Sequence, residues 1–405
     1  MTISLPNKTL RVTMPSCPPT CTARKINVNT ISPIIENGPI SPEKTIQNYS
    51  SLLLPYEMDE IYGYEEIFYI GHPDFKNSKP TYFYDIINPR DHILYRYEIL
   101  KILGSGNYGK VIEAYDHKTK RKVAIKVLKY RMHSKRETEA LLLINQNNCS
   151  NTVKGLNYFL FRKKACITFE LVGENLHQIQ TKNNFQPFKE SQVKDIALQL
   201  FQSLEEYSKI GLIHCDIKPQ NICLSLEDPE KIKIIDFGIS YINKEENSKI
   251  TYTQTRYYRS PEVILHLDYG PKVDVWSAAL VIVELLIGRP LFPGRNELEM
   301  LNLMVELLGS IPPTMARDSS KKNIFFNDDL SLKPFDGVKA KKKITVRNLL
   351  GNDCSYYLVD FIKKCLNWNP KFRITAAQAL EHPWLKQNLF FIPAFDHSNL
   401  PCLHE

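Results

Sequence analysis

Two short segments constrain this chain more than any other feature of its sequence. Residues 213–221 read Ile-His-Cys-Asp-Ile-Lys-Pro-Gln-Asn, and an apolar run at 232–235 leads into the triplet Asp-Phe-Gly at 236–238. Either segment alone arises often by chance. Their order and their spacing, with Asp236 fifteen residues after Asn221, instead indicate one site that handles phosphoryl groups.

Four residues of these segments carry the predicted chemistry. Asp216 can orient an incoming hydroxyl group and accept its proton, while Lys218 neutralises the phosphoryl group in transfer. Asn221 and Asp236 supply the hard oxygen ligands that Mg²⁺ takes. We therefore expect Asp216 and Lys218 to be catalytic, with ATP and Mg²⁺ as the cofactors.

A glycine-rich turn precedes these segments. The sequence Gly-Ser-Gly-Asn-Tyr-Gly at 104–109 separates predicted strands at 97–103 and 110–116. The dinucleotide-binding fingerprint needs its third glycine to open a helix, so this context excludes it. A glycine hairpin between two strands suits a flap whose amides close over phosphates. A tight hairpin without a ligand is the alternative.

The next predicted strand, at 122–128, contains a lysine among apolar residues. Burying Lys126 is costly unless its ammonium group has an anionic partner, and ATP phosphates and an acid on the following helix can provide one. Two acids compete for this role. We favour Glu139 over Glu137, because Glu139 leads directly into the apolar run at 141–144. A solvated lysine at the end of a strand is the alternative.

The remaining pattern predicts an α+β protein with a small β-rich lobe followed by a larger helical lobe. Two further strands and a helix complete the predicted small lobe, at 153–161, 164–171 and about 134–145. After Gly173 the chain becomes mainly helical, at 190–210, 271–288, 297–308, 356–365 and 375–380.

The first hundred residues divide into two parts. Residues 1–40 lack a periodic apolar pattern and predict a flexible tail. A helix is expected from Ser41 to Leu54. The aromatic-rich stretch at 56–69 should be buried against a neighbouring domain.

Composition excludes several classes of protein. Lys and Arg number 52 against 44 Asp and Glu, and the resulting net charge of +8 is too mild to indicate nucleic-acid binding. No apolar stretch reaches the roughly 18–20 residues of a membrane span. An odd count of 9 scattered cysteines fits reduced thiols better than a disulfide framework. We expect an intracellular protein of the cytoplasm, with the nucleus as the alternative compartment, and with no membrane and no direct nucleic-acid partner.

Taken together, these motifs over residues 97–385 resemble a eukaryotic protein kinase with a bilobal fold. Three later landmarks agree: Ser-Pro-Glu at 260–262 resembles the end of an activation segment, Asp274 resembles the aspartate that braces the catalytic loop, and Arg373 should pair with Glu262.

Finer features resemble the dual-specificity tyrosine-regulated kinases (the DYRK family) of the CMGC group. They are the His-Cys-Asp form of the catalytic loop, the run Tyr-Thr-Gln-Thr-Arg-Tyr-Tyr-Arg at 252–259 and a long insert after Gly294. Residues 90–98 are similar to that family's box before the kinase domain, and residues 45–71 to the accessory region of its class II members.

This resemblance implies the domain organisation. It gives a tail at 1–40, an accessory region at 41–96 that packs on the N-lobe, and an N-lobe at 97–171. The C-lobe is then expected at 172–390, with a CMGC-type insert at about 294–345 and a C-terminal tail at 391–405.

The resemblance also implies an ATP site between the lobes. Phe169 would be a bulky gatekeeper, backbone groups of Glu170 and Leu171 would meet the adenine, and Cys223 would replace the usual leucine beneath it. The whole expected ATP-binding set is Leu103, Gly104, Gly106, Gly109, Val111, Ala124, Lys126, Phe169, Glu170, Leu171 and Cys223.

Regulation is expected on the activation segment. Most kinases carry an arginine before the catalytic aspartate, but Cys215 cannot bind phosphate. Tyr252 lies where the family carries its regulatory tyrosine, so we expect it to be autophosphorylated. Arg256 and Arg259 would hold its phosphate, since arginine binds phosphate bidentately. Pairing of both arginines with acidic groups is the alternative.

The family prefers Ser or Thr before Pro, with an upstream arginine in the substrate. Glu284 lies on an apolar helix and could receive that arginine, because a lone carboxylate there needs a partner. The second expected carboxylate is absent, since Gln220 stands in its place, and we expect only modest selection of upstream arginine.

The expected function is therefore a monomeric, dual-specificity protein kinase that phosphorylates Ser or Thr of proteins at Ser/Thr-Pro sites. The alternative is a pseudokinase scaffold with little or no catalytic activity. A small-molecule kinase is a third reading, which the Ser-Pro-Glu motif disfavours.

Overall fold

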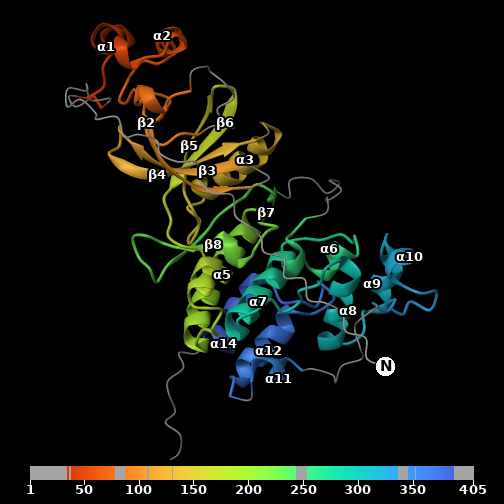
Figure 1. The fold of residues 1–405 in the computed structure, drawn as a ribbon. Coiled ribbons are helices and arrows are strands. Elements are labelled where there is room, and N and C mark those ends of the chain that lie inside the picture. The colour runs from red at the N-terminus through yellow and green to blue at the C-terminus, as the bar shows by residue number, and fades with distance from the viewer. Residues whose placement is uncertain are drawn as a thin grey trace, which may run out of the picture.

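The computed structural model describes residues 34–35, 38–77, 87–106, 109–129, 131–242, 253–335, 345–351 and 353–386, without the side chains of 131–134. Figure 1 shows a small, strand-rich lobe above a larger helical lobe, with a short helical cap from the N-terminal part of the chain on top. The predicted α+β fold with two lobes is confirmed.

The N-lobe is built on one antiparallel sheet of six strands in the order β1-β2-β3-β4-β6-β5. The helix α3 (Arg131–Gln146) contacts β4, β5 and β6. The strands are β1 (His92–Ile93), β2 (Tyr97–Ser105), β3 (Gly109–Asp116), β4 (Arg121–Leu128), β5 (Gly155–Phe161) and β6 (Lys164–Glu170).

Strand β4 is buried on both faces, and its alternate side chains belong to two different cores. Val123, Ile125 and Val127 belong to the outer core of the N-lobe. Ala124 and Leu128 belong to the core that continues into the C-lobe. Successive side chains of a strand point to opposite faces, so Lys126 shares the face of Ala124 and points between the lobes.

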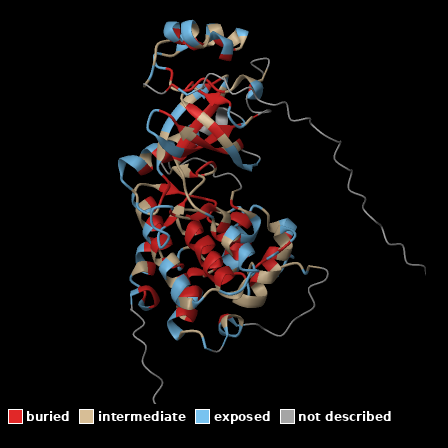
Figure 2. Ribbon diagram, turned by 60° about the vertical axis from the view of Figure 1, so that its left-hand side comes forward, coloured by how far each residue is buried: buried red, intermediate tan, exposed pale blue. Residues whose placement is uncertain are grey.

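The C-lobe is built around α7 (Lys272–Ile287), whose residues from Val273 to Leu285 are all buried. Figure 2 shows these buried residues in the interior of the lobe, with exposed residues on the surrounding helices. At the end of α7, Gly288 adopts a left-handed φ of 74°, and a Cβ there would lie 2.0 Å from the carbonyl oxygen of Phe185. Only glycine fits this approach.

The C-lobe contains further helices, some of which pack directly against α7. They are α4 (Leu176–Lys182), α5 (Glu190–Lys209), α6 (Pro261–Ile264), α8 (Glu297–Leu308), α9 (Pro313–Asp318), α10 (Lys322–Phe325), α11 (Val346–Leu350), α12 (Tyr356–Cys365), α13 (Ala376–Leu380) and α14 (Pro383–Lys386). Within the described ranges, none of the helices has the length and apolar character needed to cross a membrane.

Two short antiparallel pairs bring the two key segments together at the top of the C-lobe. Strand β7 (Leu212–Ile213) pairs with β10 (Tyr241–Ile242), and β8 (Ile222–Leu224) pairs with β9 (Ile232–Ile234). The loop at 214–221 and the triplet at 236–238 connect these strands. They therefore lie side by side below the N-lobe sheet.

The N-terminal cap consists of α1 (Pro42–Tyr49), η1 (Ser50–Leu52), α2 (Pro55–Glu60) and η2 (Ile61–Gly63). The Ser41 side chain caps α1 as expected, but the helix ends at Tyr49 rather than Leu54. Pro55 disfavours the helical conformation in the residue before it, and a 3₁₀ turn intervenes.

The cap joins the N-lobe through an apolar cluster and a buried ionic cluster. Tyr95, next to β1, packs with Ile61, Ile67 and neighbouring apolar residues of the cap. Glu57 of α2 is fully buried and accepts hydrogen bonds from Lys76 at 2.6 Å and from Arg162 at 3.3 Å. Burial alone would raise the pKa of Glu57, but His92 and Lys76 outweigh it and lower the pKa to about 2.

Candidate active site

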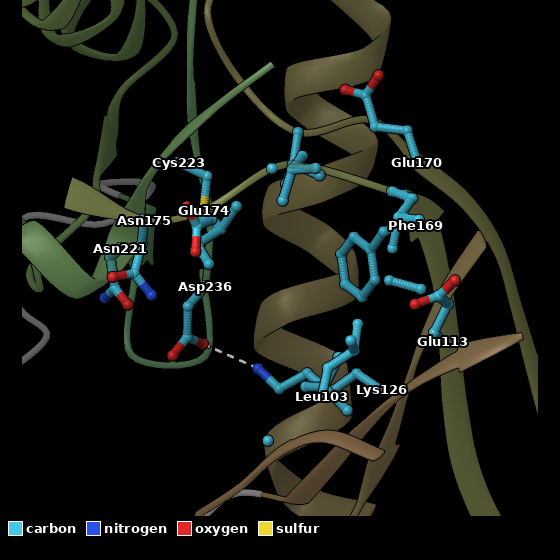
Figure 3. Close-up of a pocket in the computed structure, with 18 of the residues that line it drawn as sticks. Leu103, Glu113, Lys126, Phe169, Glu170, Glu174, Asn175, Asn221, Cys223 and Asp236 are labelled. Carbon is cyan, nitrogen blue, oxygen red and sulfur yellow. Dashed lines mark hydrogen bonds and ion pairs between the residues drawn. The ribbon is translucent and has the colours of Figure 1, made fainter. Parts of the chain in front are cut away.

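A cavity of about 590 Å³ lies between the lobes and collects most of the residues expected to bind ATP. Figure 3 shows side chains of both lobes converging on it. The expected residues that line it are Leu103, Gly104, Val111, Ala124, Lys126, Phe169, Glu170, Leu171, Asn221, Cys223 and Asp236.

Two expected glycines, Gly106 and Gly109, do not line the cavity. Their backbones exchange two hydrogen bonds, of 2.9 and 3.3 Å, at the closed end of the hairpin. Gly109 has a packing role as well, because a Cβ there would lie 2.3 Å from the carbonyl oxygen of Val127 in β4.

The chain that connects the lobes begins at Phe169, which is buried at the end of β6. The Glu170 N–H group donates to the carbonyl oxygen of Lys154 at 3.1 Å, so this N–H group is not available to a ligand. The cavity wall continues through four residues that our sequence prediction missed, Val172, Gly173, Glu174 and Asn175.

The ammonium group of Lys126 is held by two carboxylates. It donates to Glu137 at 2.7 and 2.9 Å and to Asp236 at 2.8 Å, the latter drawn in Figure 3. Burial lowers the pKa of Lys126, but the two carboxylates outweigh it and raise the pKa. The cost of burying the Lys126 charge is therefore offset by two carboxylate partners.

The prediction that Glu139 is the partner of Lys126 is wrong, because Glu137 takes this role. Glu139 is exposed, whereas Glu137 is buried. The buried face of α3 carries Ala140, Leu141 and Ile144, which follow Glu137 by three, four and seven residues. Positions with these spacings share one face of a helix, and Glu139 lies outside that face.

The Asp216 carboxylate, in the loop at 214–221, is held from several sides. Lys218 donates to one oxygen at 2.6 Å and the Asn221 amide donates to the same oxygen at 3.1 Å. The other oxygen accepts from the Thr255 hydroxyl at 2.6 Å. Thr255 belongs to the following segment and was not predicted. Its contact fixes the orientation of Asp216.

The loop itself is braced by Asp274 of α7. Its carboxylate accepts from the N–H groups of His214 at 2.7 Å and Cys215 at 2.9 Å. Cys215 has a left-handed φ of 65°, which these bonds stabilise. Burial raises the pKa of Asp274 to about 7 and outweighs the backbone hydrogen bonds that oppose it.

Two residues of the cavity could hold a metal ion. The Asn221 amide nitrogen donates to the backbone carbonyl of Asp216 at 2.9 Å, which leaves its carbonyl oxygen available. Asp236 reaches the same cavity with a left-handed φ of 67°. One carboxylate and one amide oxygen are a donor set that suits Mg²⁺.

Cys223 lies in the floor of the cavity. It is buried, and burial raises the pKa of its thiol to about 12. The thiol therefore acts as a small apolar contact and not as a nucleophile.

Tyr252 lies outside the described residues, but both arginines expected beside it are placed. Arg259 is buried and donates to the carbonyl oxygens of Thr253 at 3.0 Å and Gln254 at 2.8 Å. It also lies 3.3 Å from Glu297. Arg256 is exposed and donates to the carbonyl oxygen of Arg295 at 2.6 Å.

The two residues expected to contact a substrate are placed differently. Glu284 is buried and accepts a 2.7 Å hydrogen bond from the Tyr258 hydroxyl. Burial raises the pKa of Glu284, although Tyr258 opposes this rise. Gln220 is partly exposed and directly precedes Asn221. The expected pair of Arg373 with Glu262 is present, at 2.6 and 2.8 Å.

Comparison with known proteins agrees with this geometry. The family described as "Protein kinase domain" matches residues 97–385. The chain is similar to dual specificity tyrosine-phosphorylation-regulated kinase mbk-2 of Caenorhabditis briggsae, with 36% identity over 387 residues, 86% of this chain and 47% of the relative.

Two mammalian relatives are both called dual specificity tyrosine-phosphorylation-regulated kinase 3. The mouse protein is 36% identical over 86% of this chain and 66% of its own length. The Macaca fascicularis protein is 35% identical over 87% of this chain and 68% of its own length. The chain thus spans about half to two thirds of the length of these relatives.

Proposed function

The chain belongs to the protein kinase family and, within it, to the dual specificity tyrosine-phosphorylation-regulated kinases, and we propose that it phosphorylates Ser and Thr of proteins with ATP. One observation carries this proposal. The Asp216 carboxylate, held by Lys218, Asn221 and Thr255, lies beside the cavity that contains the paired Lys126.

The cavity fits ATP with Mg²⁺. Val111 and Ala124 would cover the adenine, and Cys223 would lie beneath it. Asn221 and Asp236 would hold Mg²⁺, which supplies charge neutralisation between phosphates. Lys126 would contact the phosphates, because its compact ammonium group acts as a point charge.

Proton transfer falls to Asp216. Its carboxylate would accept a hydrogen bond from the substrate hydroxyl and take the proton as that oxygen bonds to the γ-phosphorus of ATP and the bond from this phosphorus to ADP breaks. Lys218 already lies 2.6 Å from this carboxylate, so it would contact both the base and the transferred group. Thr255 would keep the carboxylate oriented toward the hydroxyl.

Selection of proline after the phosphoacceptor is supported by Gln254. Its φ of 67° is left-handed, and its carbonyl oxygen accepts the 2.8 Å bond from Arg259. That carbonyl is then unavailable to the N–H group of the next substrate residue. Proline has no N–H group to satisfy and would be favoured there.

Activation by autophosphorylation on Tyr252 rests on Arg259. This arginine already binds the carbonyl of Thr253, the residue after Tyr252, so it lies near the expected phosphate. Arg256 would be the second contact. Arginines bind a phosphate of about −1.5 to −2 charge through charge-assisted hydrogen bonds.

A pseudokinase scaffold is the alternative, and the complete set Lys126, Glu137, Asp216, Asn221 and Asp236 argues against it. We further propose that the enzyme is a monomer and works inside the cell, in the cytoplasm, with the nucleus as the alternative compartment. The cysteines of the described ranges are free thiols, in keeping with a reducing compartment.

Purified chain, γ-labelled ATP and a Ser-Pro peptide test the proposed activity. Transfer of label that requires Mg²⁺ and is lost in Asp216→Asn supports it. Label transfer that persists unchanged in this variant would overturn the assigned mechanism.

A further inference from the structure

A second cavity lies in the C-lobe where the start of α5 and the end of α7 meet α11 and α12. Figure 1 shows α11, α12 and α14 at the lower end of this lobe, away from the N-lobe. The cavity measures about 190 Å³, and all but one of its lining residues are apolar: Phe188, Glu190, Leu286, Leu350, Cys354 and Leu358. An apolar cavity of about 150 Å³ can bind benzene. This cavity therefore has room for one aromatic ring.

The rest of the described chain leaves this apolar lining open to water. Phe188, Leu286, Leu350 and Cys354 are each only partly buried. Tyr357, directly before the lining residue Leu358, is 40% exposed. Contiguous apolar surface that stays open to solvent marks a site of interaction. The cavity and Tyr357 together therefore form a surface that a further apolar segment can cover.

The described part of the chain ends beside this cavity. Glu190, the polar residue of the lining, accepts a 2.9 Å hydrogen bond from the indole N–H group of Trp384 in α14. It also accepts a 3.2 Å bond from the backbone N–H group of Ser355, just before α12. Helix α14 ends at Lys386, the last described residue. The chain that follows Lys386 therefore begins next to the cavity.

The sequence that follows Lys386 has the chemistry that this surface accepts. Residues 389–395 read Leu-Phe-Phe-Ile-Pro-Ala-Phe and carry no charged side chain. Burial of phenylalanine side chains is strongly favourable. Phe390 comes four residues after Lys386, and four residues of extended chain span at most about 14 Å. Phe390 and Phe391 can therefore reach the cavity that Trp384 already borders.

We propose that the pair Phe390 and Phe391 of the same chain docks on this surface, with one ring inside the cavity and the other against Tyr357. The docked segment anchors the chain after Lys386 to α5, α7, α11 and α12. This contact is separate from the ATP site and does not depend on the proposed kinase activity.

Cys354 in the cavity wall offers a direct test in the full chain. We make Phe390→Cys and Phe391→Cys separately, oxidise each with diamide and map the disulfides by peptide mass spectrometry. A disulfide needs Cβ atoms about 3.5–4.5 Å apart. We expect one of the two introduced thiols to form a bridge with Cys354 within a single chain. Cys402, farther along the same segment, is the internal control and should not form this bridge.

A second measurement uses the native thiol. In the double variant Phe390→Ser, Phe391→Ser, iodoacetamide should modify Cys354 faster than in the wild type by roughly tenfold, the factor that corresponds to burial of one aromatic ring. The thermal midpoint should fall by about 3–6 °C for the same reason. Phe395→Ser, the matched control in the same segment, should change neither quantity.

Each other result overturns the proposal in a recognisable way. Bridges to Cys354 that form as readily from Cys402 as from the two introduced thiols show a segment without a fixed position. A bridge found only between two chains assigns the cavity to a second copy of the protein. Equal alkylation rates and equal thermal midpoints in the wild type and the double variant show that the cavity stays open.

Discussion

The guanidinium group of Arg259 donates a 2.8 Å hydrogen bond to the backbone carbonyl of Gln254. Gln254 is itself pinned by its buried side chain, which donates to Ser277 at 2.8 Å and accepts from the Ser260 N–H group at 3.0 Å. Its left-handed backbone is thereby fixed. The carbonyl consequently points to Arg259 and not to a bound peptide.

This relationship predicts strong discrimination for proline. A Ser-Ala peptide would leave its N–H group without an acceptor, at a cost of about 1–3 kcal/mol, so its kcat/KM should be roughly tenfold or more below that of the Ser-Pro peptide. Paired steady-state assays measure this ratio. Equal values for the two peptides would contradict the assignment.

Asp216→Asn should lower kcat by roughly 10²–10⁴-fold, the usual contribution of a general base. The fold should be retained, since the amide has the volume of the carboxylate and can still bind Lys218. Circular dichroism and the thermal midpoint serve as the control for folding. Near-normal turnover in a folded variant would show that another group accepts the proton.

Lys126→Arg should also abolish most activity, because a planar guanidinium group does not fit a site built for a point charge between Glu137 and Asp236. Single-turnover assays at saturating ATP separate this effect from weaker nucleotide binding. A variant that turns over at the wild-type rate would contradict the assigned role of Lys126.

The two acids of α3 form a matched pair of variants. Glu137→Gln removes a charge-assisted bond worth about 1.5–3 kcal/mol, so kcat/KM should fall by roughly 10- to 100-fold. Glu139→Gln changes an exposed residue and should keep wild-type activity. The reverse order of effects in the same kinase assay would restore the sequence-based choice of Glu139.

The attachment of the N-terminal cap to the N-lobe should depend on Arg162. This residue of the turn between β5 and β6 donates to Glu60 at 2.8 and 2.9 Å and to Glu57 at 3.3 Å, and it adopts a left-handed φ of 42°. Arg162→Met leaves Glu57 with one cationic contact fewer in a buried cluster. It should weaken the attachment of the cap and reduce the phosphate found on Tyr252.

Expression in bacteria followed by mass spectrometry measures the phosphate on Tyr252. Lys163→Met, at the exposed neighbouring position, is the control and should be phosphorylated like the wild type. Full phosphorylation of Tyr252 in Arg162→Met would show that the cap does not assist autophosphorylation. An unmodified Tyr252 in a fully active wild-type preparation would overturn autophosphorylation as the activating step.

Much of the architecture follows from local rules that act within a few residues. Alternation in β4 places Ala124 and Lys126 on one face, and the order of the two catalytic segments places Asp216 and Asp236 in one site. The same rules contained the signal for Glu137, because its spacing to Ala140, Leu141 and Ile144 marks a single helical face. Glu139 lies nearer in sequence to the apolar run at 141–144, but the helical period, and not this nearness, decides which acid is buried.

Other features were decided only by the tertiary structure. The contact of Thr255 with Asp216, the turned carbonyl of Gln254 and the hydrogen bond from Trp384 to Glu190 each join residues far apart in the chain. They depend on backbone angles in loops and on which helix faces pack together in the folded C-lobe. By itself, the sequence determined which chemical groups are present and the order in which they occur, because those follow from local pattern. Packing decided which of them face one another, since a contact between distant segments has no local signature.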